Sequence, residues 1–129
     1  MDTIERAAKK FLEDRDWNRL RPSDLAKSVS IEANELLELF QWTNHELDAV
    51  RRDTAKIADI KKELADVFLY CFYMSILLGF DTETIILDKL RDASKKYPPS
   101  AVKDRGGKEP GTDAHYGLIK KAHRKRRSD

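Results

Sequence analysis

Four acidic residues are spaced so that helices could bring their carboxylates together. Glu32 and Glu35 lie three residues apart, and the same spacing separates Glu63 from Asp66. Side chains three residues apart share one face of a helix, so each pair presents two carboxylates together. Apolar residues at helical spacing border both pairs, which places the acids at the edge of a buried surface. Packing these two faces against each other would gather four carboxylates at one place.

Such a gathering of acids predicts a cation site. Crowded, partly dehydrated carboxylates repel one another, so they must either take up protons or hold a cation. An all-oxygen ligand set favours Mg2+, with Mn2+ as a substitute, whereas zinc or redox iron usually requires nearby histidine or cysteine. His45, His115 and His123 lie in a connecting segment and in the C-terminal tail. A single Glu-x-x-Glu is usually a solvated helix face, but two pairs beside apolar stripes favour a metal.

Glu38 extends the first acidic series by three residues. It lies six residues after Glu32 and is therefore rotated around the helix away from it. Glu38 is thus either a further ligand or catalytic base, or a solvated side chain, and its spacing fits both roles.

Helices are the elements that must position these acids. The chain has only five glycines and four prolines, and it lacks the alternation of β-branched and polar residues that indicates strands, so we expect an all-α fold. Ser23 is the expected N-cap of the helix that carries the first pair, and Gly79 is the expected stop of the helix that carries the second. The segment 43–54 is expected to be a connection with room for a short helical turn. The expected helices span residues 2–15, 23–42, 55–78 and 81–96.

The third expected helix is apolar almost all round. Between Leu64 and Phe80 its only charged residue is Asp66. A helix of this kind must be covered by protein on more than one side, and one small bundle offers little cover. We therefore expect a homo-oligomer.

Composition places the chain among folded proteins with one domain. It has 129 residues, of which 40% are hydrophobic and 37% are charged, enough for a single core under a charged surface. Residues 1–102 carry 16 basic against 19 acidic side chains, whereas residues 103–129 carry 9 against 4. We therefore expect a domain over 1–102 and a basic, flexible tail over 103–129.

The sequence carries no signal for a membrane or for secretion. The longest nearly uncharged stretch, 67–80, is shorter than the about 20 apolar residues that a membrane-spanning helix needs. The first residues lack a basic and then apolar signal segment. The single cysteine, Cys71, lies in an apolar run, where a thiol usually behaves as a small hydrophobe. We expect a cytoplasmic protein without membrane contact.

The acidic residues stand within a longer pattern of flanking residues. It runs from Glu32-x-x-Glu35 through Glu38-Leu39-Phe40-Gln41-Trp42 to Glu63-Leu64-Ala65-Asp66-Val67 and Tyr70. This pattern resembles the MazG-like nucleoside triphosphate pyrophosphohydrolases and, within them, the dCTP pyrophosphatases. Residues on either side that fit the same branch are Phe11, Arg15-Asp16-Trp17, Pro22, Leu25, Lys89-Leu90 and Tyr97-Pro98. The resemblance extends over about residues 4–99.

The resemblance implies a fold and a reaction. It implies an all-α, MazG-like four-helix bundle that assembles as a dimer of dimers and uses magnesium to hydrolyse a (d)NTP to the (d)NMP and pyrophosphate. The implied task is nucleotide-pool cleansing, with dCTP or a modified dCTP among the candidate substrates.

Positions that match the family imply roles for individual residues. The implied metal ligands are Glu32, Glu35, Glu63 and Asp66. The candidates for orienting or deprotonating the attacking water are Glu35 and Glu38. The implied phosphate contacts are Tyr70 and Lys89. The aromatic residues that would flank the base, partly across a subunit interface, are Trp17 and Trp42. Core packing is the alternative role for either tryptophan, because large aromatic side chains occupy cores as readily as pockets.

Three positions depart from the family pattern. Ile31 precedes Glu32 where many MazG-like chains carry a second Glu. Ala8 stands where the dCTP enzymes have a His near the base, and Ala93 stands where relatives often carry an Asn. The first departure removes one candidate ligand, the second removes a His near the base, and the third means that one phosphate or sugar contact is lost or replaced.

Two other functions are compatible with parts of the sequence. A helical nucleic-acid-binding or regulatory protein would use the basic residues in 120–127 for phosphate contacts, but it would leave the bordering acids unexplained. A catalytically idle assembly module would become more stable when Glu35 or Asp66 is replaced by alanine, and magnesium would not raise its melting temperature.

Overall fold

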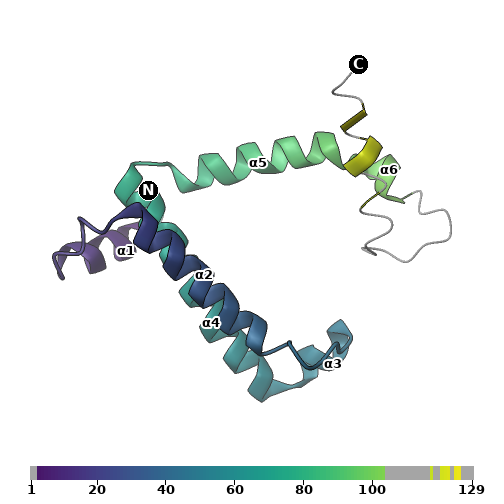
Figure 1. Cartoon of the computed structure of the whole chain (residues 1–129), viewed down its shortest axis with the longest axis horizontal. Coiled ribbons are helices and arrows are strands. Elements are labelled where there is room, and N and C mark those ends of the chain that lie inside the picture. The colour runs from purple at the N-terminus through teal and green to yellow at the C-terminus, as the bar shows by residue number, and fades with distance from the viewer. Residues whose placement is uncertain (1–2, 104–116, 118–119, 123, 126–129) are drawn as a thin grey trace. The chain divides into compact units, whose positions relative to one another are not determined.

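The computed structural model describes residues 3–103, 117, 120–122 and 124–125. Within these residues the chain is helical and forms no strand, which confirms the expected all-α fold (Figure 1). The helices in this part of the chain are α1 (Thr3–Glu13), α2 (Pro22–Glu38), α3 (Leu47–Arg52), α4 (Thr54–Leu78), α5 (Thr82–Lys96) and α6 (Pro99–Lys103).

The chain forms two compact units, residues 1–82 and 83–129. The first unit contains α1 to α4, and the second contains α5 after its first residue, together with α6. Most of the tail expected over 103–129 lies outside the described residues. Its flexibility and the domain boundary after residue 102 therefore stay predictions.

The first unit is built around α4, because α1, α2 and α3 all pack against it. Asp53 caps its N-terminus, and the Asp53 Oδ1 accepts a hydrogen bond from the Lys56 backbone N–H at 2.9 Å. The helix ends at Gly79, whose φ of 72° lies in the left-handed region that glycine adopts without steric cost. The predicted stop at Gly79 is confirmed.

The ends of α2 differ from the prediction. The helix begins at Pro22, because proline already holds the φ angle of a first helical residue, and Arg21 takes the N-cap position with extended backbone. The predicted cap at Ser23 is therefore wrong. The helix ends at Glu38 rather than at Trp42, since the Phe40 N–H turns to the carbonyl of Leu37, three residues back, at 2.9 Å.

A short helix forms in the segment 43–54, for which only a helical turn was expected. Helix α3 covers Leu47–Arg52, and it packs against α4. Asp48 in its first turn accepts a hydrogen bond from Arg51 Nη1 at 3.2 Å. An acid at the start and arginines at the end match the helix dipole, which explains how so short a helix is stabilised.

The core of the described structure is small. Its buried apolar residues are Ala8, Leu12, Leu25 and Tyr73. Many other large apolar side chains are exposed, including Leu64, Phe68 and Leu78 on α4. This exposure agrees with the sequence pattern of a helix that is apolar on more than one side.

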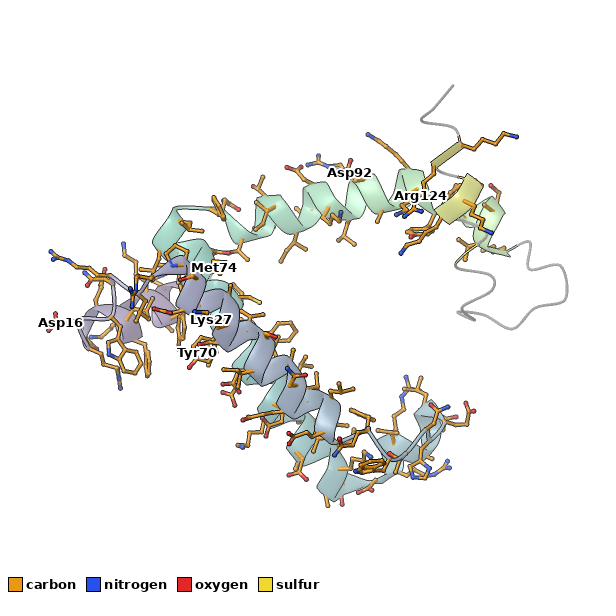
Figure 2. All side chains as sticks on the ribbon, in the orientation of Figure 1. Asp16, Lys27, Tyr70, Met74, Asp92 and Arg124 are labelled. Atoms are coloured by element: carbon orange, nitrogen blue, oxygen red, sulfur yellow. The ribbon has the colours of Figure 1, made fainter. Side chains whose placement is uncertain are left out.

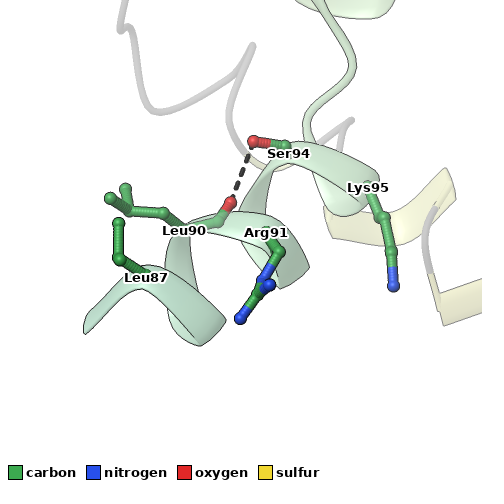
Figure 3. Close-up of a pocket in the computed structure, with 5 residues that line it drawn as sticks. All are labelled: Leu87, Leu90, Arg91, Ser94 and Lys95. Atoms are coloured by element: carbon green, nitrogen blue, oxygen red, sulfur yellow. Dashed lines mark hydrogen bonds between the residues drawn. The ribbon is translucent and has the colours of Figure 1, made fainter. Parts of the chain in front are cut away.

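Helix α5 also exposes a row of apolar side chains: Ile85, Ile86, Leu87 and Leu90. A shallow hollow of about 420 Å³ lies along this one helix and is lined by Leu87, Leu90, Arg91, Ser94 and Lys95 (Figure 3). Within it, the Ser94 hydroxyl donates to the Leu90 carbonyl at 2.9 Å. Among the described residues, no single helix is long and apolar enough to cross a membrane, although α4 and α5 taken together meet that criterion of length and composition.

Candidate functional site

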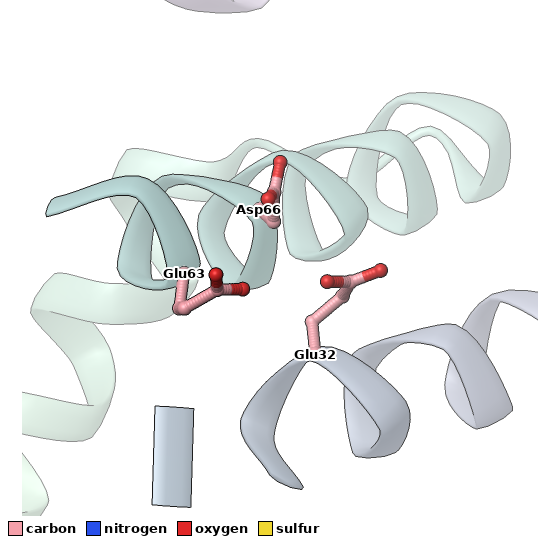
Figure 4. Close-up of side chains that lie close together, drawn as sticks. All are labelled: Glu32, Glu63 and Asp66. Carbon is pink, nitrogen blue, oxygen red and sulfur yellow. The ribbon is translucent and has the colours of Figure 1, made fainter. Parts of the chain in front are cut away.

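Three of the predicted acids converge between α2 and α4. Glu32 projects from α2 toward the face of α4 that carries Glu63 and Asp66 (Figure 4). One carboxylate oxygen from each residue lies within 4.8 Å of the others. The convergence follows from the packing of α2 along α4 and from the i, i+3 spacing of Glu63 and Asp66, which keeps both on one helical face.

The surroundings of Glu63 suit a bound cation. Its side chain is only 12% exposed, and its Oε1 accepts a hydrogen bond from Lys62 Nζ at 3.0 Å. Its Oε2 is buried and has no hydrogen-bond partner. A buried carboxylate oxygen without a donor is costly, and a cation beside the three carboxylates would satisfy it. The oxygen-only donor set fits a hard divalent ion such as Mg2+ or Mn2+.

Glu35 borders this acidic cluster and shares its electrostatics. The pKa of its carboxyl is raised above the ordinary value of 4.5, mainly because the negative charge of Glu32 repels it. The proximity of Glu63 acts in the same direction.

Lys62 also lies at the site. The sequence pattern did not predict this. Its Nζ lies 3.0 Å from Glu63 Oε1, and the Lys62 side chain is largely exposed. Its pKa is raised, first by the hydrogen bond with Glu63 and then by the charges of Glu63, Asp66 and Glu35. Neighbouring residues on a helix usually point apart, so the pairing of Lys62 with Glu63 becomes visible only in the structure.

Glu38 lies outside the cluster of three carboxylates. It is the last residue of α2, and its side chain is exposed. Among the described residues, the group that could hold an ion consists of Glu32, Glu63 and Asp66. The choice between a base and a solvated side chain at Glu38 stays open.

An aromatic pocket of about 180 Å³ lies beside the acidic cluster. Its lining residues are Trp17, Leu20, Asp24, Leu25, Ser28, Tyr70 and Tyr73. Tyr70 projects from α4 beside α2 (Figure 2). Tyr70 follows Asp66 by four residues, and Ser28 precedes Glu32 by four, so the pocket begins about 6 Å along both helices from the acids.

The turn after α1 brings Trp17 to this pocket. Asp16 adopts a positive φ of 56°, which aspartate tolerates better than most residues. The chain then reverses, and the Trp17 N–H donates to the Leu12 carbonyl at 2.9 Å. The indole packs edge-on against Phe11, with ring centroids 6.0 Å apart. Trp17 remains 47% exposed, so it forms a wall of the pocket and does not fill the core.

The remaining two predicted substrate contacts are not among the residues that line this pocket. Trp42 follows α2 in a turn and is 88% exposed, and it is not among the residues that line the pocket. Lys89 is an exposed residue of α5, in the second unit. The basic residues of the nucleic-acid alternative lie partly outside the described residues.

Comparisons with known proteins show which family the chain resembles. A sequence model of the MazG-like family matches residues 27–108, a range that contains all four predicted metal ligands. Human dCTP pyrophosphatase 1 is 27% identical over 121 residues, which cover 92% of this chain and 70% of the human protein. Bovine dCTP pyrophosphatase 1 is 27% identical over 119 residues, which cover 91% of this chain and 69% of the bovine protein.

A solved structure is similar as well. The crystal structure of a pyrophosphatase from Archaeoglobus fulgidus superposes with a TM-score of 0.65 and 28% sequence identity. The superposition covers 74% of this chain and 89% of that one. Sequence and structure comparisons therefore point to the same group of proteins.

Proposed function

This chain belongs to the MazG-like family, and we propose that it hydrolyses a (d)NTP to the (d)NMP and pyrophosphate. The observation that carries the proposal is the cluster of Glu32, Glu63 and Asp66, with a partnerless Glu63 oxygen, one helical turn from an aromatic pocket. Such a pair of sites suits a nucleotide, because its charged phosphates and its flat base need different surroundings a short distance apart.

The acidic cluster would serve the phosphates. Glu32, Glu63 and Asp66 would hold Mg2+, or Mn2+ in its place, and Glu35 beside them is the fourth proposed ligand. The ion would supply neutralisation of the triphosphate charge and activation of a water. Lys62 at the edge of the cluster is close enough to add a positive charge for a phosphate oxygen.

Glu35 is also the favoured base for the attacking water. The water oxygen bonds to the α-phosphorus, the bond from that phosphorus to the bridging oxygen breaks, and pyrophosphate leaves with the bridging oxygen. Glu35 takes the proton of the water, and its place beside Glu32 and Glu63 supports this role. Glu38 is the second candidate for this step.

The aromatic pocket would hold the base. Trp17 and Tyr70 offer ring faces, and stacking on such faces tolerates every base. Tyr70 lies between pocket and acids, where its hydroxyl group is also suited to contact a phosphate. Lys89 is proposed as a further phosphate contact. We propose dCTP or a modified dCTP as the substrate, in a cytoplasmic role of nucleotide-pool cleansing.

A homo-oligomer would complete the site. The exposed apolar residues of α4 and α5 need cover, and we propose that copies of this chain provide it as a dimer of dimers. Trp42 is exposed enough to reach the base bound by another copy.

A product assay tests the proposed function. Pyrophosphate and monophosphate release are measured for a panel of dNTPs and NTPs, with Mg2+ or with a chelator. We expect equal amounts of both products with Mg2+, none with chelator, and a loss in Asp66→Asn. Asp59→Asn is the matched control, because Asp59 is exposed on the same helix. Orthophosphate as the first product, or full activity in chelator, would overturn the proposal.

A further inference from the structure

The aromatic pocket carries two polar side chains whose role the proposed function does not explain. Asp24 and Ser28 line it from α2. They are four residues apart, and Glu32 follows after four more, so the three residues form a row along one face of the helix. The row leads from the pocket to the acidic cluster in two steps of about 6 Å each.

The carboxylate of Asp24 contacts two cations of the same helix region. Its Oδ2 accepts a hydrogen bond from Arg21 Nε at 3.2 Å, and its Oδ1 lies 3.9 Å from Lys27 Nζ. An ionised carboxylate can accept about four hydrogen bonds and donates none. Asp24 is 48% exposed, so it retains acceptor positions for a ligand in the pocket.

We infer that Asp24 selects the base, by accepting a hydrogen bond from an exocyclic amino group. This inference rests on the proposed function, and it assigns to Asp24 the preference for a pyrimidine with an amino group at position 4 over one with a carbonyl there. Cytosine carries an amino donor at position 4, whereas uracil and thymine carry a carbonyl acceptor there. A carboxylate attracts the first and repels the second. Ser28, which can donate or accept, serves the neighbouring ring nitrogen of either base.

The pocket has room for a single pyrimidine ring, since its volume is about 180 Å³. In a nucleotide the sugar separates the base from the α-phosphate. The pocket and the acidic cluster are likewise separated, by one turn along the helices.

A purely structural role for Asp24 predicts a different result. Asp24 lies in the first turn of α2, where negative charge favours any helix. Asp48 matches it closely, because it lies in the first turn of α3 and contacts an arginine at the same distance of 3.2 Å. Asp48 does not line the pocket, so Asp48→Asn controls for the loss of a helix-start charge.

The experiment compares kcat/KM for dCTP and dUTP in wild type, Asp24→Asn, Ser28→Ala and Asp48→Asn. The asparagine amide can turn either its N–H or its carbonyl to the base, so Asp24→Asn should accept both nucleotides. We expect it to lower the dCTP to dUTP ratio by about 10- to 100-fold, partly through faster dUTP hydrolysis. Asp48→Asn should leave the ratio unchanged, and Ser28→Ala should slow both nucleotides together.

Several outcomes would overturn the inference. An unchanged ratio in Asp24→Asn, with both nucleotides still hydrolysed, would remove Asp24 from base selection and leave the proposed function intact. An equal loss on both nucleotides, or an equal change in Asp48→Asn, would make its role structural. A wild-type protein that hydrolyses neither nucleotide but does hydrolyse another member of the panel would overturn this inference alone, whereas one that hydrolyses no member of the panel would overturn the proposed function as well.

Discussion

The acidic cluster and the aromatic pocket are neighbours on the same two helices, but they contribute to stability in opposite ways. Around the pocket, Leu25 and Tyr73 are buried, and the rings of Phe11 and Tyr73 stack with centroids 6.1 Å apart. These contacts stabilise the fold without any ligand. In the cluster, like charges repel, and a Glu63 oxygen has no partner. The contacts around the pocket therefore stabilise the free protein, whereas we expect the cluster to be stabilised by a cation.

Removing a ligand from the cluster should have the largest effect. Glu63→Gln keeps the shape of the side chain but removes the charge that holds the metal. We expect kcat/KM to fall by more than about 100-fold, beyond the range seen when only partners of metal ligands are changed. A steady-state assay across Mg2+ concentrations measures it.

The control for this variant is Glu13→Gln. Glu13 is exposed and pairs with Lys9 at 3.8 Å, so its loss should leave activity unchanged. Activity of Glu63→Gln close to that of wild type would show that the cluster does not perform the reaction.

Magnesium alone should stabilise the cluster and hence the fold. A ligand that binds only the folded state adds about 2.7 kcal/mol to the free energy of unfolding at 100 times its Kd. Thermal unfolding with and without Mg2+ should show a higher Tm in its presence for wild type and little change for Glu63→Gln. An equal Tm with and without Mg2+ in wild type would favour an idle helical assembly.

Replacing Trp17, which forms the exposed wall of the aromatic pocket, should weaken nucleotide binding. Trp17→Ala removes a ring face for stacking, which contributes about 1–3 kcal/mol per base, so KM for the nucleotide should rise while the Mg2+-induced change in Tm persists. Trp17→Phe keeps a ring and should lose less. If Trp17→Ala abolished the Mg2+ effect instead, pocket and cluster would not be separate regions.

The smallest expected effect is the contribution of Glu35 to the pH dependence of stability. Its raised pKa means that the folded protein binds this proton more tightly than the unfolded chain does. Its contribution to stability is therefore present at pH below its ordinary pKa of 4.5 and is lost as the pH rises through the raised value. Without metal, Glu35→Gln should be slightly more stable than wild type at neutral pH and equal to it in acid.

Urea unfolding in chelator at several pH values measures this difference. Mg2+ should cancel it, because a cation offsets the repulsion from Glu32. A stabilising effect of Glu35→Gln that is the same at every pH would contradict the electrostatic explanation.

The sequence predicted the two regions unequally. The approach of Glu32 to Glu63 and Asp66 followed from i, i+3 spacing, because the helix period decides which side chains share a face. The pocket depends on tertiary structure: Trp17 reaches it through a turn with positive φ at Asp16, which no periodic pattern reveals. The place of Asp24 in the lining of the pocket was also not predicted, since on its helix alone Asp24 resembles any solvated acid.

The predicted helix ends also differ in how well they agree with the structure. Gly79 ended α4 as predicted, because a left-handed glycine is a local signal. Ser23 was predicted as a cap and lies inside α2, since Pro22 was already able to begin the helix. Serine is favourable as an N-cap and proline is favourable as the first helical residue, and the sequence alone did not show which of the two sets the start of α2.

The position of bond cleavage tests the central claim most directly. Wild type and Glu63→Gln are incubated with dCTP and Mg2+ in water labelled with oxygen-18, and the products are analysed by mass spectrometry. The account predicts that the label enters the monophosphate, that pyrophosphate stays unlabelled, and that Glu63→Gln forms neither product at a comparable rate. Label in pyrophosphate or orthophosphate, or undiminished product from Glu63→Gln, would contradict it.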